Sequence, residues 1–185
     1  MTQSTDDLLA RATQAMLDAK DAESLALLGT LLEQDPMCAQ AHYLMAAQQA
    51  QLGELGVAEQ EFRAALQLSP GFVMARFQLG QLLLVTARNN EAIQMLTPLS
   101  ESVDGALGGY ASALISIAND HIELAISQLQ MGLAQAQPVV ALQADMQRLV
   151  RTLSEGQATA QTTQPDTAGA LPGASMLLSN YSRYN

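Results

Sequence analysis

The sequence is poor in aromatic residues and in cysteine. None of its 185 residues is tryptophan, and aromatic side chains make up only 4% of the chain. A hydrophobic core must therefore be built from aliphatic side chains and methionine rather than from large rings. The single cysteine, Cys38, excludes an intrachain disulfide, so the sequence does not indicate a secreted disulfide scaffold.

Basic residues are also scarce. Eight Lys and Arg residues stand against eighteen Asp and Glu residues, which gives a net charge of −10 at pH 7. Such a field repels phosphate backbones and anionic lipid surfaces, so we expect no nucleic acid partner and no binding to an anionic membrane. Two histidines and one cysteine are too few for a conventional zinc site, and we expect neither a metal nor a cofactor.

Long apolar runs and catalytic motifs are missing as well. No run of about 18 apolar residues occurs, so we expect no membrane insertion. The first seven residues, MTQSTDD, lack the features of a signal peptide, which favours a cytoplasmic protein. The phosphate-binding, nucleophile-elbow and H-E-x-x-H motifs are absent. His121 beside Asp120 falls where a solvated turn is expected, and we expect no enzyme.

Hydrophobic residues nevertheless make up 49% of the chain, and they recur with a long period. Pro36 and Pro70 are 34 residues apart, and two further steps of 34 reach Asp104 and Pro138. Before each of these points lie two helix-length segments with apolar residues at three- and four-residue steps. Self-similarity at this period predicts a stack of helix pairs that bury their apolar faces against one another.

The unit at residues 39–72 has Ala58, Phe62 and Pro70 in its second half. It resembles the tetratricopeptide repeat, whose pattern is W-x2-L-G-x2-Y, then A-x3-F, then P. The later units fit in part, with Gly80, Ala92 and Leu96 in the third and Tyr110, Ala125 and Leu129 in the fourth, whose inter-helix turn is one residue short. The resemblance covers about residues 5–140. It implies an all-α helix-turn-helix solenoid of about four repeats.

Two further features follow from packing rules. Small residues such as Ala58 and Gly80 let two helices approach closely, while Phe62 and Leu96 fill the space beside them. Pro98 lies late in a predicted helix, and we expect that helix to kink or to end early because proline removes a hydrogen bond and clashes with the preceding turn.

A last amphipathic segment follows the repeats, and it predicts a C-terminal capping helix that ends at Gly156. We therefore expect a repeat domain over residues 1–155 and a flexible tail, rich in Gln, Thr, Ala and Ser, over residues 156–185. Within the tail, residues 171–185 are either a disordered end with scattered apolar side chains or a short docking motif. The stripe of the capping helix consists of Leu142, Met146, Leu149, Val150 and Leu153.

In tetratricopeptide proteins the first helix of each repeat lines a concave groove that holds a peptide or a helix. Segment 73–85 is apolar on all sides, so it must be covered on more than one face, either by neighbouring helices or by an apolar partner segment. The resemblance places the following residues in the groove: Tyr43, Ala47, Gln51, Met74, Phe77, Gln81, Leu84 and Ile115.

The resemblance implies a noncatalytic function. The first hypothesis is an adaptor or scaffold that binds a segment of a partner protein in an apolar groove. Small acidic proteins of three to four repeats also resemble the secretion chaperones that hold apolar segments of bacterial translocator proteins, and such a chaperone is the alternative.

Overall fold

The computed structural model describes residues 4–102, 105–136 and 140–160, and all regular structure in these ranges is helical. The chain forms two compact units, one with the described residues up to Leu79 and one with those from Gly80 onward. Each unit is described separately below. The helices are α1 (Thr5–Leu17), α2 (Asp21–Gln34), α3 (Ala39–Gln51), α4 (Leu55–Leu68), α5 (Val73–Val85), α6 (Asn89–Ser102), α7 (Ala106–Ala118), α8 (Ile122–Leu133) and α9 (Val140–Ala160).

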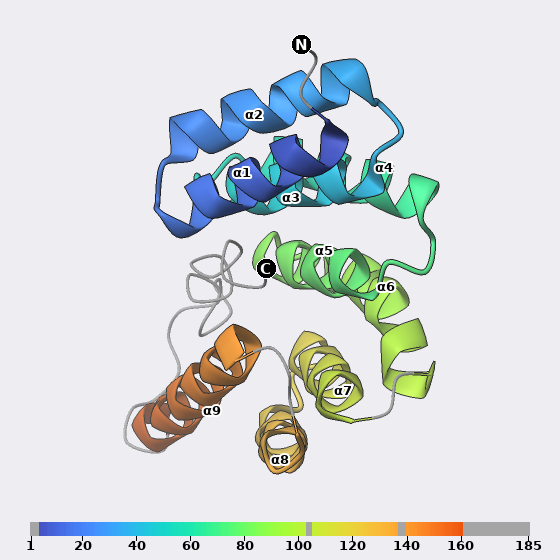
Figure 1. Ribbon diagram of the computed structural model, residues 1–185. Helices are drawn as coiled ribbons and strands as arrows, with labels where there is room; N and C mark the ends of the chain where they lie inside the picture. Colours follow the sequence, from blue (N-terminus) through green and yellow to red (C-terminus); the bar gives the residue numbers. More distant parts are fainter. Residues whose placement is uncertain (1–3, 103–104, 137–139, 161–185) are drawn as a thin grey trace. The chain divides into compact units, whose positions relative to one another are not determined.

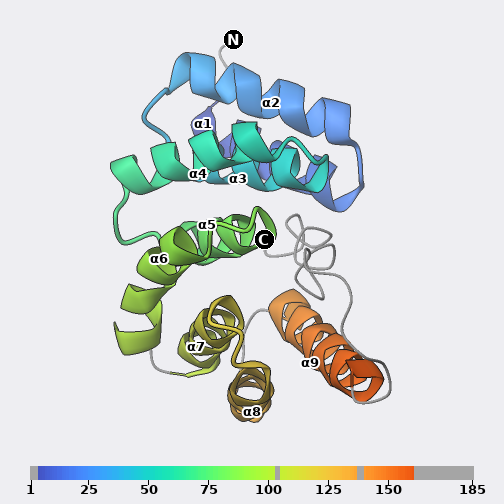
Figure 2. The same cartoon turned by 180° about the vertical axis from the view of Figure 1, so that it is seen from behind.

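The first unit contains two helix pairs. Helix α1 packs on α2 and α3 packs on α4, while α2 also contacts α3 (Figures 1 and 2). The small residues Ala46 and Ala58 and the large Phe62 are all fully buried, as the repeat pattern predicts for closely packed helices. The first, weakest unit of the repeat also folds as a helix pair, with Leu8, Ala12 and Leu28 in its core.

The turns inside the repeats follow the period of the sequence. One residue with positive φ lies in each of them: Ala19 (55°), Gly53 (85°), Ala87 (58°) and Asp120 (60°). The spacing is 34, 34 and 33 residues, which confirms that the fourth turn is one residue shorter. Only glycine adopts this backbone conformation without steric cost, so three of the four turns hold a strained residue.

The second unit contains α6 to α9, with contacts from α6 to α7, from α7 to α8 and from α8 to α9. Glycines set the closest approaches. A Cβ added at Gly80 would lie 2.5 Å from Leu96 Cδ2, and one added at Gly132 would lie 2.7 Å from Tyr110 Cε1. The predicted match of a small residue with a large one is therefore confirmed for Gly80 and Leu96.

Helix α6 runs through Pro98 to Ser102, so the expectation that it ends early is wrong. Its apolar face explains why. Ala92, Leu96 and Leu99 are buried on both sides of the proline, and this packing outweighs the lost backbone hydrogen bond, which costs about 3 kcal/mol in an exposed helix.

Helix α9 packs on α8 as the predicted capping helix, with Leu142, Met146, Leu149 and Leu153 buried and Val150 half-buried. The predicted end at Gly156 is wrong, because α9 continues to Ala160. Gly156 is not among the residues with positive φ, so it does not form the left-handed cap that would end a helix there. The proposed domain boundary at 155/156 thus falls inside α9, and most of the predicted tail, residues 161–185, lies outside the described residues.

No helix in the described part of the chain combines the length and apolar character that a membrane crossing requires.

Candidate functional site

Five of the predicted groove residues lie in the first unit, and they differ in exposure. Tyr43 and Ala47 on α3 are buried, with 2% and 0% of their surface exposed, and Phe77 on α5 is fully buried. Met74 is half-buried, and Gln51 at the end of α3 is exposed. Only Met74 and Gln51 of this set are therefore open to a partner without movement of other groups.

Tyr43 is the centre of an aromatic cluster. Its ring centroid lies 4.7 Å from that of Phe72 and 6.1 Å from that of Phe62. Burial raises the pKa of the Tyr43 hydroxyl above its ordinary range, and a hydrogen bond with the Gln78 side chain offsets part of this rise. In this structure Tyr43 builds the core between helices and keeps its phenol neutral.

The remaining predicted groove residues, Gln81, Leu84 and Ile115, belong to the second unit. Gln81 and Leu84 on α5 are 1% and 0% exposed, while Ile115 on α7 is half-buried. Residues 81 and 84 are one helical step apart and share a face of α5. Neither Nε2 nor Oε1 of the buried Gln81 has a hydrogen-bond partner.

Other polar side chains on the first helices are bonded to the second helices. Gln48 Nε2 on α3 donates to Asp21 Oδ1 on α2 at 2.8 Å. Ser116 Oγ on α7 donates to Gln128 Oε1 on α8 at 2.7 Å. The repeat pattern does not mark these pairs, because it describes apolar positions. The only signal in the sequence is a polar residue inside an otherwise apolar helix.

His42 is a packing residue between two helices, as the sequence suggests for this position. Its Nδ1 lies 2.6 Å from Glu61 Oε2 on α4, and its Nε2 lies 3.0 Å from the backbone carbonyl of Pro36. The ring is half-buried. It therefore links α3, α4 and the loop that enters the repeat.

His121 and Asp120 lie in the turn between α7 and α8. His121 is exposed and precedes the first residue of α8, and Asp120 has positive φ. This confirms the solvated turn. Among the described residues no group of three or more His, Cys, Asp or Glu side chains could hold a metal ion.

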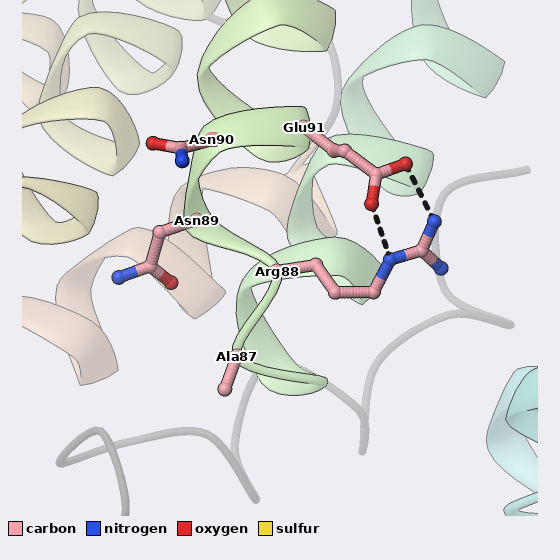
Figure 3. A pocket seen from close by; sticks show the side chains of 5 residues that line it. All are labelled: Ala87, Arg88, Asn89, Asn90 and Glu91. Carbon is pink, nitrogen blue, oxygen red and sulfur yellow. Dashed lines mark hydrogen bonds and ion pairs between the residues drawn. The ribbon is translucent and has the colours of Figure 1, made fainter.

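A hollow of about 290 Å³ lies at the turn between α5 and α6. The Arg88 guanidinium pairs with both carboxylate oxygens of Glu91, at 2.6 and 2.5 Å, and these two side chains extend away from Asn89 and Asn90 (Figure 3). Asn89 Nδ2 donates to the carbonyl of Ala118 at 3.0 Å. These contacts fix the turn and connect it to the end of α7, so they account for the polar residues without a ligand.

The acidic side chains of the first third lie at helix ends. Asp6 and Asp7 occupy the first turn of α1, where the Ser4 hydroxyl accepts from the Asp7 backbone N–H, and Asp21 begins α2. Asp18 follows α1, and a hydrogen bond from Gln14, with a further contribution from Lys20, lowers its pKa. Carboxylates at helix starts interact favourably with the free backbone N–H groups, which explains their placement.

No family model matches the chain, and no curated protein sequence matches it. Solved structures do. The chain is similar to "MamA RS-1 ArsTM double mutant" with a TM-score of 0.60 and 18% identity, over 86% of this chain and 99% of that one. It is similar to "MamA 41-end from Desulfovibrio magneticus RS-1" with the same score and identity, over 88% of this chain and 96% of that one. These likenesses support a tetratricopeptide-type helical repeat fold.

Proposed function

We propose that the protein is a noncatalytic interaction module that binds an uncharged, apolar segment of a partner protein on the first helices of its repeats. The observation that carries this proposal is the near absence of charge from α3, α5 and α7. Arg76 is the single Asp, Glu, Lys or Arg in these three helices, and its Nη2 donates to the carbonyl of Pro70.

The second helices of the same repeats contrast with this. Each of α4, α6 and α8 carries at least one acidic residue, among them Glu59, Glu91 and Glu123. Charge on one helix of every pair and none on the other is the pattern of a solvated face opposite an apolar one. An apolar segment fits such a surface, whereas an acidic peptide would find no pair of basic side chains on it.

The half-buried residues are the points at which a partner first makes contact. Met74 in the first unit and Ile115 in the second unit keep part of their side chains accessible, while Phe77 and Leu84 are fully buried beneath the surface. Met74 is well suited to this role, because methionine is flexible and polarisable and adapts to partners of different shape.

The test compares Met74→Glu and Ile115→Glu with Leu124→Glu in capture experiments from the native organism. Leu124 lies on the second helix α8 and is 51% exposed, so its variant adds the same charge elsewhere. We expect both first-helix variants to lose the partner and the α8 variant to keep it, with unchanged helical circular dichroism in all three. Retention of the partner by both first-helix variants would refute the proposal.

The composition of the captured material separates the adaptor from the chaperone. A secretion-type chaperone should hold one client that aggregates in its absence, whereas an adaptor should bring several members of one complex. The acidic surface and the uncharged first helices are compatible with either, since both need an apolar binding face on a soluble protein.

A further inference from the structure

The Gln81 side chain poses a problem of hydrogen bonding. It lies in the middle of α5 with 1% of its surface exposed, and neither its amide nitrogen nor its amide oxygen has a partner. Burial of an unsatisfied amide costs free energy, and native structures rarely leave such a group unpaired. Among the described side chains of the second unit, Gln81 alone leaves both a donor and an acceptor unmet.

The chemistry of the missing partner follows from the amide. Gln81 presents N–H donors and a carbonyl acceptor on one planar group, which matches the N–H and C=O of a peptide backbone. A helix cannot supply these groups, because its backbone is already paired within the helix. An extended segment leaves them free on its edge. The ligand of Gln81 is therefore an extended polypeptide rather than a helix.

We propose that this ligand is the C-terminal segment of the same chain, residues 171–185, bound in extended form along α5. This inference rests on the proposed function, since it uses the same apolar surface. Leu84, on the same face of α5 as Gln81, is fully buried and supplies the apolar neighbour for such a segment. A partner protein must then displace the segment before it can bind.

The composition of the segment fits this surface. It reads LPGASMLLSNYSRYN and carries a single charged side chain, Arg183. Its apolar residues include Met176, Leu177 and Leu178, which match a helix face without charge. Proline and glycine at positions 172 and 173 disfavour a helix at its start and favour extended backbone.

The length of the chain also allows this contact. Twenty-five residues follow Ala160, the last residue of α9, and ten of them precede the segment. Ten extended residues reach about 33–36 Å. A compact unit of this size has a radius of gyration of only about 13 Å, so the connection can cross it without disturbing the helices.

The first test is amide hydrogen exchange on the full-length protein. We expect the backbone amides of residues 174–182 to be protected in the wild type, and Gln81→Met to raise their exchange by about tenfold, as the loss of a paired hydrogen bond would. Gln130→Met, which changes an exposed glutamine of α8, serves as the matched control and should leave the exchange unchanged. Random-coil exchange of residues 174–182 in the wild type would overturn the proposal, as would equal protection in Gln81→Met.

A second test does not depend on a substitution in the core. In the full-length variant with Leu177→Asp and Leu178→Asp the segment should leave the surface. A fluorescein-labelled peptide of residues 171–185 should then bind to this variant, as measured by anisotropy, and at least tenfold more weakly to the wild type. A peptide N-methylated at the backbone of residues 177 and 178 should not bind. Equal binding of the methylated and unmethylated peptides would contradict the backbone contact.

The two proposals can fail separately. If residues 174–182 are protected through Gln81 but Met74→Glu and Ile115→Glu keep every partner, the segment binds the surface and the proposed partner function is wrong. If the segment is unprotected while these variants lose the partner, the proposed function holds and the C-terminal segment is not the occupant.

Discussion

Gly80 on α5 lies directly against the side chain of Leu96 on α6, so closely that a Cβ at position 80 would come within 2.5 Å of both Cγ and Cδ2 of the leucine. Leu96 is fully buried and has no free space into which it could turn. We expect Gly80→Ala to lower the free energy of unfolding by about 1–3 kcal/mol, the usual cost of overpacking a core. Urea denaturation followed by circular dichroism measures this change.

Two other helical glycines are the controls for this substitution. A Cβ at Gly29 or Gly56 would meet no atom within 4 Å. Alanine there should stabilise the protein by about 0.5–1 kcal/mol, because glycine loses more conformational freedom on folding. If Gly80→Ala were as stable as Gly56→Ala, the close contact between α5 and α6 would be absent in solution.

The strained turn at Ala87 should be relieved by glycine. Its φ of 58° disfavours a side chain, whereas Gly53 holds the equivalent position one repeat earlier. We expect Ala87→Gly to raise the free energy of unfolding by about 0.5–1 kcal/mol, since the relief of strain exceeds the entropy that glycine adds to the unfolded chain. The reverse change, Gly53→Ala, should lower it by a similar amount. Thermal unfolding of the two variants provides the comparison, and equal shifts in the same direction would exclude this explanation.

The link between His42 and Glu61 should contribute to stability as a pair. The two side chains approach to 2.6 Å between α3 and α4, and both are largely shielded from solvent. We expect His42→Ala and Glu61→Ala each to destabilise the first unit, and the double variant to lose less than the sum. The coupling energy should be about 0.5–3 kcal/mol, which a double-mutant cycle measures. Additive losses would show that the two residues act independently.

The positions of the helices could be predicted well from the sequence, because they depend on punctuation and period. Segment 73–85 is bounded by Pro70 with Gly71 before it and by a repeat turn after it, and α5 has the same limits. The effects of Pro98 and Gly156 were predicted wrongly. Local rules suggest an end at both, but buried residues on either side hold α6 together, and Gly156 stays in right-handed helical backbone.

The exposure of the candidate site was harder to predict. A helix that is apolar on all sides, such as α5, has no polar face to show which residues remain accessible. The repeat pattern therefore marks Phe77 and Met74 equally, although the first is fully buried and the second is only half-buried. The contact between His42 and Glu61 joins residues 19 positions apart on different helices, and no periodicity of a single helix reveals it.

The buried tyrosine Tyr43 should make the protein sensitive to alkaline pH. Burial raises the pKa of its hydroxyl in the folded state above the value of about 10 in the unfolded chain. A group whose pKa is raised on folding gives its full stabilisation below the unfolded value, and this stabilisation is lost as the pH rises above about 10. We therefore expect the free energy of unfolding to fall above about pH 10 and Tyr43→Phe to flatten this fall. Tyr110, whose pKa is also raised by burial, leaves a smaller fall in that variant. Urea titrations at a series of alkaline pH values measure the slope, and an identical slope in wild type and Tyr43→Phe would show that Tyr43 does not titrate with unfolding.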